Sequence, residues 1–196
     1  MRLYLQLASW NSNPVIQGLT VYKALKQTNL TVGQWVSISG AGGGLGHLDT
    51  GEKKKELVMK LGAEKWVDFR ESGDNLIKDV TAAADGQGPE AAVIAAGDAR
   101  PFNQAIMYLR AKGTLVCVGM PPGDALLNVP LALLIAKSLT IVGTAIGNQQ
   151  DVTETIRMSQ LGKVSCLHEV KTLDNLNEIL DDLDKGKVAG RVVIKY

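Results

Sequence analysis

The sequence predicts an α/β protein with a doubly wound, Rossmann-like and mostly parallel sheet that carries helices on both faces. Apolar runs rich in β-formers alternate with segments of helical periodicity along the chain. A glycine-rich turn, residues 40–46, directly follows the first of these runs. The continuous apolar run Glu90–Ala96, between Pro89 and Gly97, is typical of a strand covered on both faces. Strands that alternate with helices favour parallel pairing through right-handed crossovers.

The first half of the chain predicts two strands and three helices. The helix over Gly18–Gln27 has apolar residues at helical spacing, and Gly62 ends a later helix. In chain order we expect helix Gly18–Gln27, strand Gln34–Gly40, helix Glu52–Leu61, strand Lys65–Phe69 and helix Asp74–Ala84.

The second half continues the alternation. Residues 120–130 contain three prolines and a glycine, which predicts a loop. Asp151 is a suitable N-cap for the helix that it begins. In chain order we expect strand Glu90–Ala96, helix Pro101–Arg110, strand Gly113–Gly119, helix Leu131–Lys137, strand Leu139–Ala145, helix Asp151–Leu161, helix Leu173–Leu183 and strand Arg191–Tyr196.

Composition excludes several classes of function. Lys and Arg number 21, Asp and Glu number 20, and the net charge is +1, so we expect neither a nucleic-acid nor a membrane partner. Cys117 and Cys166 are too few for a disulfide framework or a Cys-rich metal site, which favours free thiols in a reducing compartment. The apolar stretch at the start is too short for a membrane span and lacks a small-residue cleavage site, so we expect a cytoplasmic protein.

The glycine-rich turn is a candidate phosphate-binding loop. Its position after a strand would let backbone N–H groups approach a pyrophosphate, although a merely flexible loop is the alternative. The G-x-G-x-x-G spacing fits only with Ala41 in the first place, followed by Gly43 and Gly46. The acidic residue that binds ribose usually follows about 20 residues later, whereas Asp49 follows Gly46 by three. Either Asp49 has no such role, or an αβ unit has been lost.

Other reactive residues have simpler explanations. His47 and His168 are the only histidines; His47, beside the glycine turn, could touch a phosphate, but an exposed side chain is favoured for both. Cys117 is expected in the core of a strand. Ser37 and Ser39 have no partner His at a suitable spacing, so a hydrolase triad is not supported.

Six strings resemble the yeast and fungal branch of the zinc-dependent medium-chain alcohol dehydrogenases. They occur in the order of that family from about Asn13 to the end: GLTVYKALK, ISGAGGGLG, DTGEKKKELVMKLGAEKWVDF, LRAKGTLVCVGMP, LTIVGTAIGN and KGKVAGRVVIKY. The resemblance implies three regions. They are residues 1–17, a remnant linker; residues 18–190, a dinucleotide-binding domain; and residues 191–196, a strand that belongs to the catalytic domain in the family.

The resemblance also implies a function and a set of contacts. Enzymes of this family oxidise primary or secondary alcohols by passing a hydride to NAD, with a zinc ion that two Cys and one His hold. By similarity, the pyrophosphate of NAD would contact Gly43, Gly44 and Leu45, and its adenosine ribose would contact Asp49 and Lys54. The nicotinamide side would be lined by Val118, Met120, Thr144 and Ile146, and Arg191 would reach the cofactor from the last strand.

Three departures from the family change the expectation. The zinc-binding catalytic half is absent from this sequence, and Ile16 stands where the family has a Cys ligand. Leu48 runs directly into Asp49, where the family has a helix and a strand of about 15–20 residues. We therefore expect no catalytic residue, no zinc site and no alcohol turnover from this chain alone. The alternative is a non-catalytic pseudoenzyme or dimerisation module that binds NAD weakly; a zinc-free reductase would need its own N-terminal domain.

Two structural expectations follow from these departures. Lys65–Phe69 should move beside Gln34–Gly40 and give a five-stranded sheet, because an empty strand position leaves backbone groups without partners. Asp49 would then lie in the glycine loop, repel the phosphates and weaken NAD binding. We also expect a homo-oligomer through Leu139–Ala145, which pairs the coenzyme domains in the family and would be an exposed edge strand here.

Overall fold

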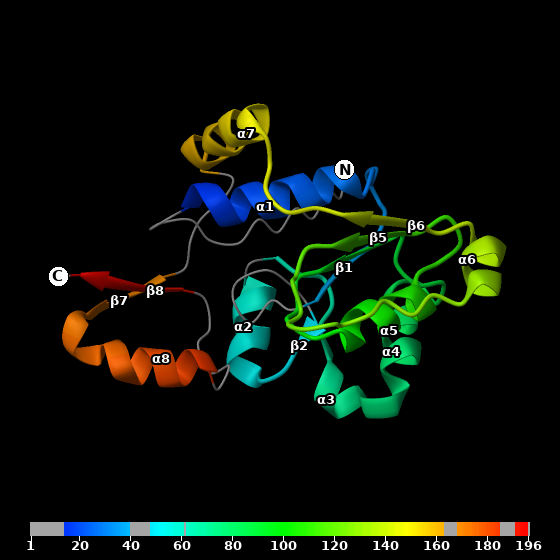
Figure 1. The fold of residues 1–196 in the computed structure, drawn as a ribbon, viewed down its shortest axis with the longest axis horizontal. Coiled ribbons are helices and arrows are strands. Elements are labelled where there is room, and N and C mark those ends of the chain that lie inside the picture. Colours follow the sequence, from blue (N-terminus) through cyan, green and yellow to red (C-terminus); the bar gives the residue numbers. More distant parts are fainter. Residues whose placement is uncertain (1–13, 40–47, 61, 163–167, 185–190, 196) are drawn as a thin grey trace.

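The computed structural model describes residues 14–39, 48–60, 62–162, 168–184 and 191–195 of the chain. Its centre is a parallel six-stranded sheet of order β3-β2-β1-β4-β5-β6, with helices on both faces (Figure 1). β1 lies in the middle of the sheet, β2 and β3 follow on one side of it, and β4, β5 and β6 follow on the other side. The predicted doubly wound α/β class is confirmed.

The six strands differ in length. Four of them have four residues each and pair along their whole length: β1 (Val36–Ser39), β4 (Ala91–Ile94), β5 (Thr114–Cys117) and β6 (Thr140–Gly143). The other two, β2 (Leu48–Asp49) and β3 (Val67–Asp68), have two residues each. The strands are therefore longer on the β6 side of the sheet than on the β3 side.

Apart from α3, the described helices occur where the sequence predicted them, and most of their ends differ by a few residues. They are α1 (Pro14–Gln27), α2 (Glu52–Lys60), α3 (Phe69–Ser72), α4 (Leu76–Ala83), α5 (Arg100–Tyr108), α6 (Leu131–Lys137), α7 (Gln149–Gln160) and α8 (Leu176–Asp184). Single 3₁₀ turns, Gly73–Asn75 and Leu173–Asn175, precede α4 and α8. The α3 turn was not predicted; it begins where the expected strand Lys65–Phe69 ends early, because Asp68 caps it.

Two apolar clusters hold helices to the two faces of the sheet. On one face, α4 and α5 pack on the sheet through fully buried residues that include Ile94, Ile106 and Leu115. On the other face, Ala24 of α1 packs against Ile38, Val93 and Val116. All four residues of β4 are buried, as a strand covered on both sides requires.

The expected closure of the sheet is wrong. Lys65–Phe69 does not pair with Gln34–Gly40, since β2 lies between β1 and β3 and pairs with both. Leu48 pairs with Ser39, and Asp49 pairs with Asp68. Asp49 is therefore the last residue of a strand and does not lie within the glycine loop. The two-residue strand supplies pairing partners at the carboxyl end of the position that closure would have filled.

The cap of α7 also differs from the prediction. Asn148 is the N-cap, and its side chain accepts a hydrogen bond from the Asp151 backbone N–H at 2.9 Å. The Asp151 carboxylate in turn accepts from the Asn148 N–H at 2.9 Å, which completes a capping box. The same carboxylate accepts a hydrogen bond from Lys26 Nζ at 2.8 Å, so the cap also joins α7 to α1.

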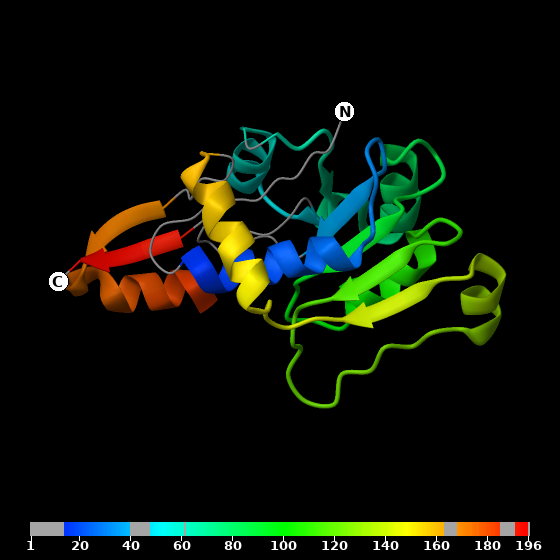
Figure 2. The same ribbon diagram turned by 90° about the horizontal axis from the view of Figure 1, so that it is seen from above.

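A separate two-stranded sheet follows α7. β7 (His168–Thr172) pairs in parallel with β8 (Arg191–Lys195), and α8 connects them. This unit lies beyond the carboxyl ends of the six main strands (Figures 1 and 2). Within the part of the chain that the structure describes, none of the helices has both the length and the apolar character needed to span a membrane.

Candidate functional site

The strand order places a candidate site at the carboxyl edge of the main sheet. The order reverses between β1 and β4, because the chain leaves β1 toward β2 and leaves β4 toward β5. Ligands of open α/β sheets bind outside the carboxyl ends of the strands at such a switch point. Residues 40–47 follow β1 at this point, so the predicted contacts Gly43, Gly44 and Leu45 lie outside the described residues.

One row of residues crosses this edge. Val67, Leu48, Ser39, Ile94, Cys117 and Gly143 are level with one another in the register of the six strands. The next residues toward the carboxyl end therefore include Asp68, Asp49, Val118 and Thr144. The ladder continues at this level, since the N–H of Val118 donates to Ile94 O and that of Thr144 to Cys117 O, both at 2.9 Å. Three predicted contacts, Asp49, Val118 and Thr144, thus share one row.

Lys54 lies close to this row in sequence and in structure. Only Thr50 and Gly51 separate Asp49 from α2, and the Lys54 backbone N–H donates to Gly51 O at 3.1 Å in the first turn of that helix. A cationic side chain in this turn would lie on the side of the sheet where the second strand ends. The structure therefore places Asp49 at the end of β2 and Lys54 in the first turn of the helix that follows it.

Asp68 organises this corner, and sequence analysis missed it. Its carboxylate accepts hydrogen bonds from the Gly51 N–H at 3.1 Å and the Arg70 N–H at 2.9 Å. Partial burial alone would raise the pKa of Asp68, but these backbone hydrogen bonds and one from the Thr50 side chain outweigh it and lower the pKa. The ionised carboxylate joins the β2–α2 turn to the start of α3. The available signal was an Asp near the end of the expected strand Lys65–Phe69.

The ends of β5 and β6 carry exposed apolar side chains. Met120 is 80% exposed and Ile146 is 62% exposed. Between β5 and Met120, Gly119 lies so close to the segment after β4 that a Cβ there would overlap the Ala96 carbonyl oxygen. A backbone this close to its neighbour, followed by exposed apolar side chains, can form an apolar surface for a planar ring at the edge of the sheet.

The remaining predicted residues lie elsewhere or are not reactive. Arg191 is the first residue of β8 and pairs with His168 in the small sheet, not in the main one. Cys117 is a free thiol whose pKa is raised by burial, which does not favour a nucleophile. His47 lies outside the described residues. Among the described residues, no group of three His, Cys, Asp or Glu side chains is arranged to hold a metal.

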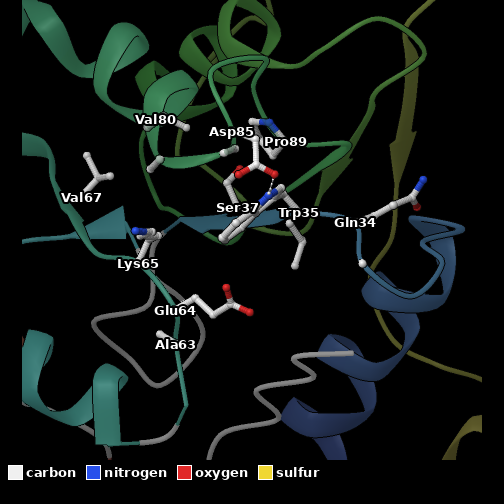
Figure 3. A pocket seen from close by; sticks show the side chains of 14 residues that line it. Gln34, Trp35, Ser37, Ala63, Glu64, Lys65, Val67, Val80, Asp85 and Pro89 are labelled. Carbon is white, nitrogen blue, oxygen red and sulfur yellow. Dashed lines mark hydrogen bonds between the residues drawn. The ribbon is translucent and has the colours of Figure 1, made fainter. Parts of the chain in front are cut away.

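A pocket of about 230 Å³ lies at the opposite, amino end of the sheet (Figure 3). Its walls come from the start of β1, from the segment before β3 and from the end of α4, and include Trp35, Glu64 and Ala84. It contains none of the predicted cofactor contacts.

Known proteins resemble this chain over most of its length. Residues 30–160 match the family described as zinc-binding dehydrogenase, a range that contains the whole six-stranded sheet and α7. Alcohol dehydrogenase 1 of Neurospora crassa is 37% identical over 193 residues, which cover 90% of this chain and 54% of that protein. Alcohol dehydrogenase 1 of Emericella nidulans is 38% identical, with 91% and 55% covered.

Solved structures agree with these relatives. The crystal structure of the alcohol dehydrogenase of Aeropyrum pernix superposes with a TM-score of 0.80 at 30% identity, and the match covers 91% of this chain and 55% of that one. The chain thus spans about half the length of the relatives that it matches.

Proposed function

This chain belongs to the zinc-binding dehydrogenase family, and from that premise we propose that it binds NAD at the carboxyl edge of its six-stranded sheet, as the coenzyme-binding part of an alcohol-oxidising system. The observation that carries the proposal is the row that contains Asp49, Val118 and Thr144. Asp49 is the last residue of β2, whereas Val118 and Thr144 each follow the last paired residue of β5 and β6. This fold binds dinucleotides at that edge.

Several residues at or near the edge have a specific role in this proposal. Asp49 accepts hydrogen bonds from the adenosine ribose hydroxyls, and Lys54, in the first turn of α2, contacts the same ribose. The backbone N–H groups of Gly43, Gly44 and Leu45 bind the pyrophosphate. Met120 and Ile146 cover one side of the nicotinamide ring and exclude water from it. Bound NAD would supply the hydride acceptor for the alcohol.

We expect the affinity for NAD to be lower than that of a dinucleotide fold with a complete first βαβ unit. Eight residues, 40–47, connect Ser39 to Leu48, whereas a crossover with its helix needs at least about 10–12. A long helix with its N-terminus at the pyrophosphate contributes to binding in complete units.

We also propose that these 196 residues do not turn over alcohol by themselves. The family reaction relies on a metal that polarises the alcohol oxygen and lowers its pKa. Ile16, at the position that resembles a Cys ligand, offers no donor atom. Alcohol-dependent formation of NADH by the purified chain, with one zinc per chain by mass spectrometry, would contradict this part of the proposal.

Calorimetric titration with NAD tests the binding site. Asp49→Asn should weaken binding of both NAD and ADP-ribose by about tenfold or more, since a charged partner of the ribose hydroxyls is lost. Asp74→Asn, an exposed residue of the turn before α4, is the matched control and should change the affinity less than about twofold. Absence of saturable NAD binding, or equal affinity of the Asp49→Asn variant, would refute the site.

The second candidate function is a non-catalytic module that pairs with a copy of itself through β6. Among the described residues, β6 pairs only with β5 and leaves its other edge without a strand partner. Thr140 and Thr144 direct their N–H groups toward β5, so that of Ile141 faces the free edge. We expect a dimer by light scattering at micromolar concentration and a monomer for Ile141→Pro, which removes that donor. A monomeric wild-type chain would exclude this function.

A further inference from the structure

One strand position of the main sheet is only partly filled. β1 pairs with β4 through all four of its residues, but with β2 only at its last residue, Ser39. β2 also pairs with β3. Because neighbouring strands lie about 4.8 Å apart, β1 and β3 are held roughly 10 Å apart, the width of one intervening strand. At the amino end of this position the structure describes no strand.

The backbone of β1 turns polar groups toward this position. The Trp35 carbonyl accepts from the N–H of Glu90 at 3.0 Å, and the Ser39 carbonyl accepts from that of Ala95 at 2.8 Å, so both face β4. Since backbone groups alternate along a strand, those of Val36 face the other way. No described strand pairs with Val36 on that side, although Val36 is half-buried and Ser37 next to it is buried. Backbone groups in such a place favour a hydrogen-bonding partner.

The pocket at the amino end of the sheet lies in this same position. Figure 3 shows residues of β1 on one side of it and Ala63, Glu64, Lys65 and Val67 on the other. The α4 side is lined by small apolar residues, among them Ala83 and Ala84. The pocket thus lies between the β1 segment and residues 63–67, and the short side chains of Ala83 and Ala84 line its α4 side.

We propose that this pocket binds the end of an extended peptide from another polypeptide, which adds as a short strand between β1 and residues 63–67. A peptide backbone presents donors and acceptors on both of its edges, as this position requires. The peptide would continue the pairing that β2 already makes with both neighbours. Branched apolar side chains fit against α4, where Ala83 and Ala84 leave room.

Charge defines the peptide further. The ionisable side chains that line the pocket are Glu64, Lys65 and Asp85, which together carry a charge of −1 when ionised. The Asp85 carboxylate accepts a hydrogen bond from Trp35 Nε1 at 2.6 Å, which fixes it at the wall (Figure 3). A peptide with a cationic residue near Asp85 and Glu64 complements this charge, so the ligand is a short extended peptide with apolar residues and one basic residue.

The test uses the full chain labelled with ¹⁵N and the peptide amide Lys-Val-Ser-Val. We expect saturable shifts of the Val36 and Lys65 amide signals. A matched peptide with N-methylated valines should bind about tenfold more weakly or worse, because it cannot pair with the strand edges. A peptide with Glu in place of Lys should also bind more weakly.

Two tryptophan variants locate the binding. Ala83→Trp fills the pocket and should weaken binding about tenfold or more, whereas Ala82→Trp, at an exposed position of the same helix, should change it less than about twofold. NAD should not compete, since its proposed site is at the other end of the sheet.

Four results would overturn the proposal. Equal affinity for the N-methylated peptide, or no shift at Val36, would exclude strand addition. Binding that appears only after deletion of residues 1–13 would assign the pocket to the chain itself. Val36 shifts that depend on protein concentration alone would assign it to a second copy.

Discussion

The two halves of the main sheet differ in how completely they are built. In the half made by β4, β5 and β6, each strand pairs over four residues, and Ile94, Leu115 and Val116 are fully buried. In the half made by β2 and β3, each strand has two residues, and Val67 is only half-buried. Both halves nevertheless end in the same row at the carboxyl edge. The row at the carboxyl edge therefore needs only the last residues of each strand, whereas the core needs the full length of the strands.

Core truncation should separate the two halves most strongly. Leu115→Ala should lower the free energy of unfolding by about 3 kcal/mol, because Leu115 is fully buried among α4 and α5 contacts. Val67→Ala in β3 should lower it by about 1 kcal/mol, since this side chain is half-buried. Urea unfolding measures both values. Similar losses at the two positions would mean that the halves are equally well packed.

A methyl group added at Gly119 should reveal how tightly the half of the sheet made by β4, β5 and β6 is packed at its carboxyl edge. Gly119→Ala should cost about 2 kcal/mol, because the new Cβ would overlap the Ala96 carbonyl oxygen and lie 2.8 Å from the Ala95 carbonyl carbon. Gly97→Ala is the control, since no atom lies within 4 Å of its new Cβ. Thermal unfolding of the two variants compares them directly. Equal stability would show that the backbone at Gly119 can move freely.

The stability of the half made by β2 and β3 should depend on the helix cap that Asp68 provides. Asp68→Ala removes the side-chain cap of α3 and the bond to the Gly51 N–H, and should cost about 1 kcal/mol. Asp74→Ala, at an exposed position nearby, should cost less than about 0.5 kcal/mol. Chemical denaturation gives both values, and amide exchange of residues 48–51 should increase only in Asp68→Ala. Unchanged exchange there would argue against the role of Asp68 at this corner.

The smallest effect concerns the contact between α1 and α7 and appears only at acidic pH. The Tyr22 hydroxyl donates to Glu154 Oε2 at 2.5 Å; that bond, and then Lys26 and Gln150, lower the pKa of Glu154 to about 2. Because the folded pKa lies below the unfolded value near 4.5, the stabilisation is complete above about pH 5 and is lost as the pH falls toward 2. Glu154→Gln should flatten the fall of the unfolding midpoint over this range. An unchanged slope would contradict the role of Glu154.

Local patterns predicted most of the elements, and the reason is visible in particular residues. Glu90–Ala96 was predicted as a buried strand from its apolar run, and β4 occupies its centre. Leu131–Lys137 was predicted with both ends correct. The N-cap of α7 was misplaced by three residues because Asn148 and Asp151 both suit a cap, and only the path of the chain before the helix decides between them. The candidate contacts Asp49, Val118 and Thr144 were named by resemblance, and their common row was not visible in sequence.

By itself, the sequence determined the alternation of strands and helices, the parallel class of the sheet and the family, because apolar periodicity and short motifs are local properties of the chain. Only the tertiary structure decided that Leu48–Asp49 forms a strand between β1 and β3, with Asp49 at the carboxyl edge of the sheet. It also decided that a pocket lies at the amino end of the same strand position. Two residues are too few to show periodicity. Their conformation follows from the backbone groups that neighbouring strands offer, and those neighbours are brought together by the fold.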